Sequence, residues 1–245
     1  MSESTEYTGV QTPPAPMPSF WEDVIEIFVH PVEVLRRRAN GSFWAPYLFV
    51  VIVIGVIGIA TFDSLQPMYE AEMTRQMAAS SQKLTPEQAA AATTFGLKFA
   101  KYIAPVGIAF FMIVLGFIIW LVSKIFSAKT TLNQAFVVVA WAYFPRILGT
   151  IAVGVQGLFI DATSLTSVQA VSLSPARFLD PATANPVLFQ VLGRFDVTIL
   201  WETVLLAIGI YVTGKISKNA AIWFGVTMFV LGLLPVIRQG FMMMK

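Results

Sequence analysis

The stretch FWAPYLFVVIVIGVIGIATF, residues 43–62, decides the fold of this chain, because it runs for 20 residues without a charged side chain. An α-helix needs about 20 apolar residues to cross the ~30 Å hydrocarbon core of a bilayer. Inside that core every backbone N–H and C=O group must be bonded within the segment, which a helix achieves. The stretch therefore predicts an integral membrane protein.

Four further stretches are similarly apolar. Two of them carry no charge, and the other two carry one charge each, Arg146 and Glu202. Together with the first stretch they predict an all-α integral membrane bundle of five transmembrane helices. The predicted spans cover residues 43–62, 102–123, 132–159, 197–213 and 219–237.

The composition supports a membrane protein and argues against several other classes. Of the 245 residues 56% are hydrophobic and only 12% are charged, whereas soluble proteins average about 25% charged residues. A net charge of +2 gives no reason to expect a nucleic-acid partner. Cysteine is absent and His30 is the single histidine, so neither a thiolate nor a multi-histidine metal site is available. We expect no metal and no cofactor.

The chain before the first span divides into a tail and an amphipathic region. Residues 1–18 are polar and proline-rich and predict a disordered cytoplasmic tail, followed by one membrane domain over residues 19–245. Ser19 and Glu22 have the spacing of a capping box, and Pro31 suits the start of a second short helix. The first helix would place Phe20, Val24, Ile27 and Phe28 on one face and Glu22, Asp23 and Glu26 on the other. We expect these helices at the membrane interface or against the bundle.

A basic cluster just before the first span predicts the orientation of the chain. It consists of Arg36, Arg37 and Arg38. Basic residues beside a span are retained in the cytoplasm, so this cluster sets an N-terminus inside and, after five spans, a C-terminus outside. The short links 124–131 and 214–218 are also basic and contain no acid, in agreement with a cytoplasmic position.

The two charges within spans are the candidate functional residues. A charged side chain near the centre of a membrane helix costs about 2.5–3.5 kcal/mol on insertion scales, so such residues are usually paired or functional. The predicted depths of Arg146 and Glu202 differ by about 5–9 Å at 1.5 Å per residue, a gap that their long side chains can close. A salt bridge between the third and fourth spans is one hypothesis, and a polar path for substrate or ions is the other. Pro145 should kink the third span beside Arg146.

Sequence patterns give no support for catalysis or nucleotide binding. The nucleophile elbow GxSxG and the zinc motif HExxH are both missing, and no span holds an acidic pair. Residues 209–215 fit GxxxxGK, but Ile216 replaces the Ser or Thr that would bind Mg²⁺. We therefore expect neither an enzyme nor a nucleotide-binding protein.

Several motifs occur in an order that resembles the Yip family, the Ypt/Rab-interacting membrane proteins and their bacterial relatives. They are His30–Leu35, Phe43–Pro46, Thr131–Phe136, Ala140–Arg146, Phe195–Glu202 and Gly214–Ala221. The resemblance implies a five-span bundle with a cytoplasmic N-terminus. Eukaryotic members bind small GTPases, but the Asp-Leu-x-Gly-Pro element of that branch is missing before the first span, so GTPase binding is not expected. The chain is more similar to the bacterial branch, which implies the bacterial inner membrane and protein partners such as export machinery.

These observations favour a non-enzymatic multi-pass protein that acts through membrane protein partners as a scaffold, assembly factor or trafficking and export accessory. The alternative hypothesis is a transporter or channel component with a polar path near Arg146 and Glu202. A dry seam around the two charges would favour the first hypothesis, and a wet cavity the second.

Overall fold

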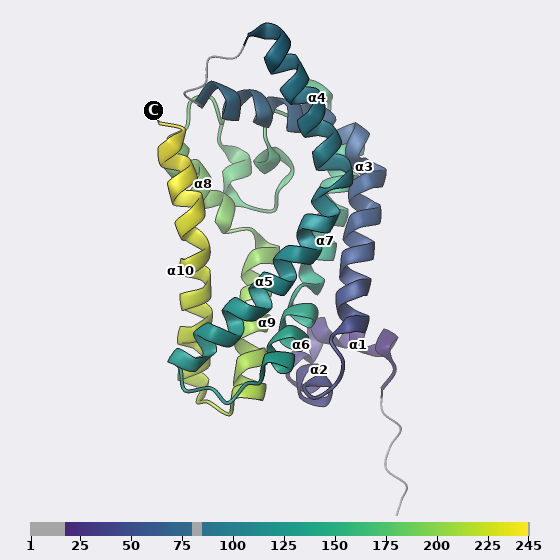
Figure 1. Ribbon diagram of the computed structural model, residues 1–245, viewed down its shortest axis with the longest axis vertical. Helices are drawn as coiled ribbons and strands as arrows, with labels where there is room; N and C mark the ends of the chain where they lie inside the picture. The colour runs from purple at the N-terminus through teal and green to yellow at the C-terminus, as the bar shows by residue number, and fades with distance from the viewer. Residues whose placement is uncertain (1–17, 80–84, 245) are drawn as a thin grey trace, which may run out of the picture.

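The computed structural model describes residues 18–79 and 85–244. Within these ranges all regular elements are helices, and five segments are long and apolar enough to cross a membrane (Figure 1). The predicted all-α, five-span fold is thus confirmed. Of the tail predicted for residues 1–18, only Pro18 lies among the described residues.

The five spans and the helices that connect them follow one another along the chain. The spans are α3 (Trp44–Ala79), α5 (Ala104–Ile125), α6 (Leu132–Ala142) together with α7 (Phe144–Phe159), α9 (Val197–Gly214) and α10 (Lys218–Met242). Two short helices precede them, α1 (Phe20–Val29) and α2 (Pro31–Arg38). The connections contain α4 (Pro86–Tyr102), α8 (Pro186–Arg194) and the 3-10 turns η1 (Ala162–Ser164), η2 (Val168–Val171) and η3 (Pro175–Phe178).

Helix α6 forms the centre of the bundle. Its residues from Val137 to Ala142 are all buried, and it packs against α3, α5 and α9. Trp141 stacks on Phe144 at the start of α7, with ring centroids 4.9 Å apart. Such aromatic pairs contribute about 0.5–1.5 kcal/mol beyond their burial. The half of the bundle that lies nearest the basic cluster is therefore tightly filled.

The third span is interrupted at Tyr143, between α6 and α7. Pro145 occupies the first turn of α7 and has no N–H to donate to the carbonyl of Trp141 four residues earlier. Tyr143 has φ −78° and ψ −9°, and its carbonyl accepts a hydrogen bond from the Arg146 N–H at 2.9 Å. The interruption places Arg146 in the first turn of a new helix rather than in the middle of a long one.

The connections at the end of the bundle far from the basic cluster form a second packed layer. Helix α3 continues past its uncharged segment, and its Leu65 and Met68 are buried together with Leu165 and Val171 of the later connection. Helix α4 lies at this same end, at the top of Figure 1, and ends at Tyr102 shortly before Pro105. This second core fixes the outer ends of α3 and α7 relative to each other.

Helices α1 and α2 form a hairpin that packs against the bundle. Ile27, Val34 and Leu35 are fully buried in the main core, and Phe28 contacts Trp201 of α9 edge to face. Asp23, which the sequence places on the acidic face of α1 with Glu22 and Glu26, has a completely buried side chain. The reason is tertiary: α2 folds back on α1 and brings two arginines to this carboxylate.

Candidate functional site

Arg146 and Glu202 meet between α7 and α9. The Arg146 Nε donates a hydrogen bond to Oε2 of Glu202 at 2.6 Å. The Glu202 side chain is buried, whereas 29% of the Arg146 side chain remains exposed. The ion pair is therefore shielded from solvent at Glu202, which we call its closed side, and partly accessible at Arg146, which we call its open side.

Two local features bring these helices close enough for the pair. Gly149, three residues after Arg146, faces Thr198, and a Cβ at this glycine would lie 3.0 Å from the Thr198 methyl carbon. Asp196 caps the start of α9 by accepting a hydrogen bond from the Thr198 N–H at 2.9 Å. Glu202 follows one turn later on the buried face of α9. The small size of Gly149 and the capping of α9 by Asp196, rather than the charges alone, thus set the geometry of the ion pair.

The open side of Arg146 faces a cavity of about 490 Å³, which we call the outer cavity. Lining residues come from the outer parts of α3, α5, α7 and α9, from the end of α4 and from the η2 connection. Its polar wall comprises Tyr69, Lys101, Tyr143, Arg146, Thr150, Gln169, Ser172, Asp196 and Thr198. The other members of the wall are mainly apolar, among them Ile54, Phe62, Ile108, Val153 and Ile199.

The outer cavity ends at the level of Tyr143. Below this residue the bundle is filled by the buried α6 segment Val137–Ala142 and by Leu205 and Ile210 of α9. None of these α6 and α9 residues lines the cavity. The surroundings of the pair thus combine the two expected situations, a dry seam behind Glu202 and a polar space in front of Arg146. In this conformation the outer cavity therefore does not continue through the bundle.

Arg194 is a third charge beside the pair that the sequence pattern did not reveal as a candidate. Its Nε is buried without a hydrogen-bond partner among the described residues, and its guanidinium lies over the Phe229 ring at 5.7 Å. Burial lowers the pKa of Arg194 below its ordinary value; nearby Glu202 opposes this shift, and Arg146 adds to it. Arg194 comes near the Arg146–Glu202 pair only because α8 docks on α10, where Gly232 leaves room for its side chain.

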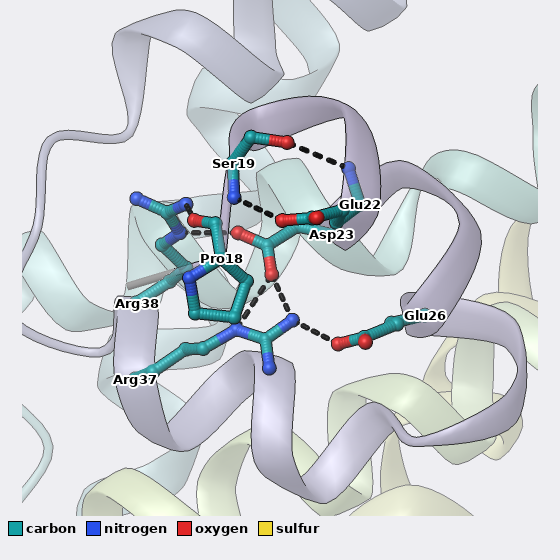
Figure 2. Close-up of polar contacts among 7 residues, drawn as sticks. All are labelled: Pro18, Ser19, Glu22, Asp23, Glu26, Arg37 and Arg38. Atoms are coloured by element: carbon teal, nitrogen blue, oxygen red, sulfur yellow. Dashed lines mark hydrogen bonds and ion pairs between the residues drawn. The ribbon is translucent and has the colours of Figure 1, made fainter. Parts of the chain in front are cut away.

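The basic cluster forms a different charged site, at the α1–α2 hairpin. Figure 2 shows Arg37 and Arg38 directed at Asp23, with Arg37 also bonded to Glu26. Arg38 donates a further hydrogen bond to the Pro18 carbonyl at 2.8 Å. Burial alone would lower the pKa of Arg37, but its hydrogen bonds to Glu26 and Asp23 outweigh this and leave the pKa raised. We call the set of contacts that Arg37 and Arg38 make with Asp23, Glu26 and Pro18 the hairpin clamp.

The third arginine of the basic cluster lies apart from the clamp. Arg36 is exposed, and the described residues offer it no acidic partner within ion-pair distance. Two of the three arginines are thus engaged by carboxylates in the folded chain.

The GxxxxGK stretch serves helix packing. A Cβ at Gly209 would lie 2.3 Å from Val138 of α6, and one at Gly214 would lie 2.7 Å from Ala128. Both glycines are therefore needed for close approach within the bundle. Within residues 18–79 and 85–244 there is also no group of three His, Cys, Asp or Glu residues that could hold a metal ion.

The fold and these sites define a class: a five-span helical membrane protein with an N-terminal helical hairpin. The family model of the Yip1 domain matches residues 25–238, from the second half of α1 to near the end of α10. The chain belongs to the Yip1 family, as the resemblance predicted.

A curated relative agrees with this assignment. The protein named Membrane protein YknW from Bacillus subtilis (strain 168) is 30% identical over 192 residues, which cover 77% of this chain and 77% of that protein. No solved structure matches the chain significantly.

Proposed function

We propose that this chain is a non-enzymatic membrane protein that acts through protein partners in the bilayer, in an assembly, trafficking or export accessory role. The proposal places it in a bacterial inner membrane with the N-terminus in the cytoplasm and the C-terminus outside. The name of its Bacillus subtilis relative, a membrane protein, supports a bacterial membrane. The two short basic links support the orientation, because they meet at one end of the bundle, where the Lys129 N–H bonds the Gly214 carbonyl at 2.9 Å.

The observation that carries the proposal is an exposed phenylalanine pair on α4. Phe95 and Phe99 are 71% and 52% exposed, and their rings lie 6.4 Å apart. Both precede Lys101, whose ion pair with Asp63 marks the end of the uncharged parts of α3 and α5. Phe95 stands six residues before Lys101, which is about 9 Å farther along a helix. Exposed apolar patches can mark protein contacts, and we infer that this aromatic pair is the centre of such a contact.

A matched pair of variants tests this surface. We expect Phe95→Ala/Phe99→Ala to release proteins that co-purify with the wild-type chain from native membranes in mild detergent. The control Phe110→Ala/Phe111→Ala removes two phenylalanines of α5 that are equally exposed, at 71% and 51%, but lie within its uncharged segment. Retention of the same proteins by both variants would contradict the α4 surface, and co-purification of none by the wild type would contradict the function.

Transport remains the competing function, because Arg146 faces a polar space. The filled segment below Tyr143 argues against it in this conformation. The double replacement Arg146→Gln/Glu202→Gln removes both charges and leaves a neutral polar side chain at each position. Normal expression with loss of an ion or solute flux in reconstituted vesicles would favour transport and exclude a purely structural role for the pair.

A further inference from the structure

We propose that the outer cavity binds one anionic phospholipid, with its phosphate at the Arg146 guanidinium and its apolar part along Ile54, Ile108 and Ile199. The proposal adds a ligand to a site that the partner-based function leaves unused. It stands independently of that function.

The first support is an excess of free donors on the cavity wall. Only the Nε of Arg146 is engaged by Glu202, and among the described residues no hydrogen bond involves its two terminal nitrogens. A guanidinium offers paired N–H groups that match the oxygens of a phosphate. The hydroxyl groups of Tyr69 and Tyr143 line the same space and likewise lack a partner among the described residues.

The acids around the cavity are already occupied. Both carboxylate oxygens of Asp196 accept hydrogen bonds, one from the Leu173 N–H at 2.8 Å and the other from Thr198. Asp63 is bound by Lys101 at 2.6 Å, and Glu202 by Arg146. The three cations around the site, Arg146, Lys101 and Arg194, balance these three acids in number. The unused donors, rather than net charge, therefore favour an anion.

An acceptor on the wall points to the remainder of the headgroup. Oε1 of Gln169 is buried and has no hydrogen-bond partner among the described residues. Such an orphaned acceptor is costly unless a donor reaches it. A headgroup that carries hydroxyl groups, such as phosphatidylglycerol, supplies donors to Gln169 as well as oxygens to Arg146. A simple anion supplies only the oxygens.

The apolar wall distinguishes a lipid from a soluble anion. Ile54 and Ile108 lie on spans α3 and α5, and Ile199 lies on α9, which faces them across the cavity. From Ile54 to Phe62 is eight residues, so the wall extends for about 12 Å along α3. A space within spans that combines such a wall with one guanidinium suits an amphipathic ligand.

Two glycines provide a matched test, because each has open space where a side chain would begin. A Cβ added at Gly58 or at Gly107 meets no atom within 4 Å, but only Gly58 lines the outer cavity. Gly58→Leu should fill the cavity without disturbing the packing, whereas Gly107→Leu should project from α5 away from it. Lys101→Gln is a second variant, which removes a positive charge from the cavity wall and leaves Asp63 without its partner, so that the site becomes less favourable for an anion.

The measurement is native mass spectrometry of the purified full chain in mild detergent, supplied with phosphatidylglycerol or phosphatidylcholine. We expect one phosphatidylglycerol per chain, bound about tenfold more tightly than phosphatidylcholine, a difference of about 1.4 kcal/mol. Gly58→Leu should reduce this affinity by at least about tenfold and Gly107→Leu should leave it unchanged, whereas Lys101→Gln should reduce it severalfold.

Four results would overturn the proposal, the last of which applies if Gly58→Leu does not fold. Equal binding of phosphatidylglycerol by Gly58→Leu and Gly107→Leu would place the lipid elsewhere. Equal binding of the two lipids would remove the role of the anionic headgroup. Displacement of the lipid by excess inorganic phosphate would identify the site as one for a soluble anion. If Gly58→Leu does not fold, unchanged affinity in Lys101→Gln decides against the site.

Discussion

The hairpin clamp and the Arg146–Glu202 pair both bury a carboxylate, but they use their arginines differently. In the clamp, Asp23 receives two guanidinium groups from α2, and Glu26 takes a further contact from Arg37. In the pair, Glu202 receives one N–H of one arginine, and the rest of that guanidinium faces a cavity. In the clamp both carboxylates thus have arginine partners, and the contacts close a local hairpin. The pair joins helices that are 56 residues apart in the sequence and keeps donors free for a ligand.

The largest effect is expected from Asp23→Ala, which would break the clamp. Removing one member of a buried ion pair costs about 3–5 kcal/mol. Asp23 is the completely buried member that both arginines share, and its loss would leave Arg37 with Glu26 alone and Arg38 with the Pro18 carbonyl. SDS titration of the chain in mixed micelles, followed by circular dichroism, measures the change in unfolding free energy. Glu33→Ala on α2 is the control, because Glu33 is exposed and its side chain makes no hydrogen bond or ion pair within the described residues. A loss no larger than that of the control would contradict the structural role of Asp23.

A smaller effect is expected from Glu202→Gln, because the cavity can still solvate the Arg146 that it leaves behind. We expect a loss of about 1–3 kcal/mol, the range for a buried polar group left unsatisfied. The double variant Arg146→Gln/Glu202→Gln should recover part of that loss, with a coupling of about 0.5–3 kcal/mol in a double-mutant cycle. Strict additivity of the two single variants would show that the pair does not stabilise the fold.

The smallest effect is expected from Arg36→Gln, which tests whether the clamp uses all three arginines. Arg36 is exposed, and surface substitutions of this kind change stability by no more than about 0.5 kcal/mol. The same unfolding titration applies, with Arg37→Gln as the matched substitution. A loss for Arg36→Gln equal to that for Arg37→Gln would show that charge at this end, rather than the contacts with Asp23, stabilises the hairpin.

The two regions also differ in how far the sequence predicts them. The spans follow from uncharged stretches, because lipid cannot satisfy an exposed backbone. The depths of Arg146 and Glu202 follow from their distances to the span ends, so a contact was foreseeable. Whether the pair lies in a dry seam or faces a cavity depends on how the spans pack, so the sequence left both alternatives open. The burial of Asp23 was not foreseeable, because its partners lie 14 and 15 residues later and reach it only when α2 folds back. Arg194 was missed for a similar reason, since its position depends on the docking of α8.

The hairpin clamp also has a consequence for the order of events during synthesis. Arg37 and Arg38 can act as an orientation signal only while their guanidinium groups are free, before α2 closes on Asp23. After closure, Arg36 alone among the three keeps its charge uncovered. If the basic cluster sets the orientation, it does so during insertion, and the finished protein then uses two of the same side chains to hold the hairpin. Arg37 and Arg38 would then act first during membrane insertion and afterwards in the folded hairpin.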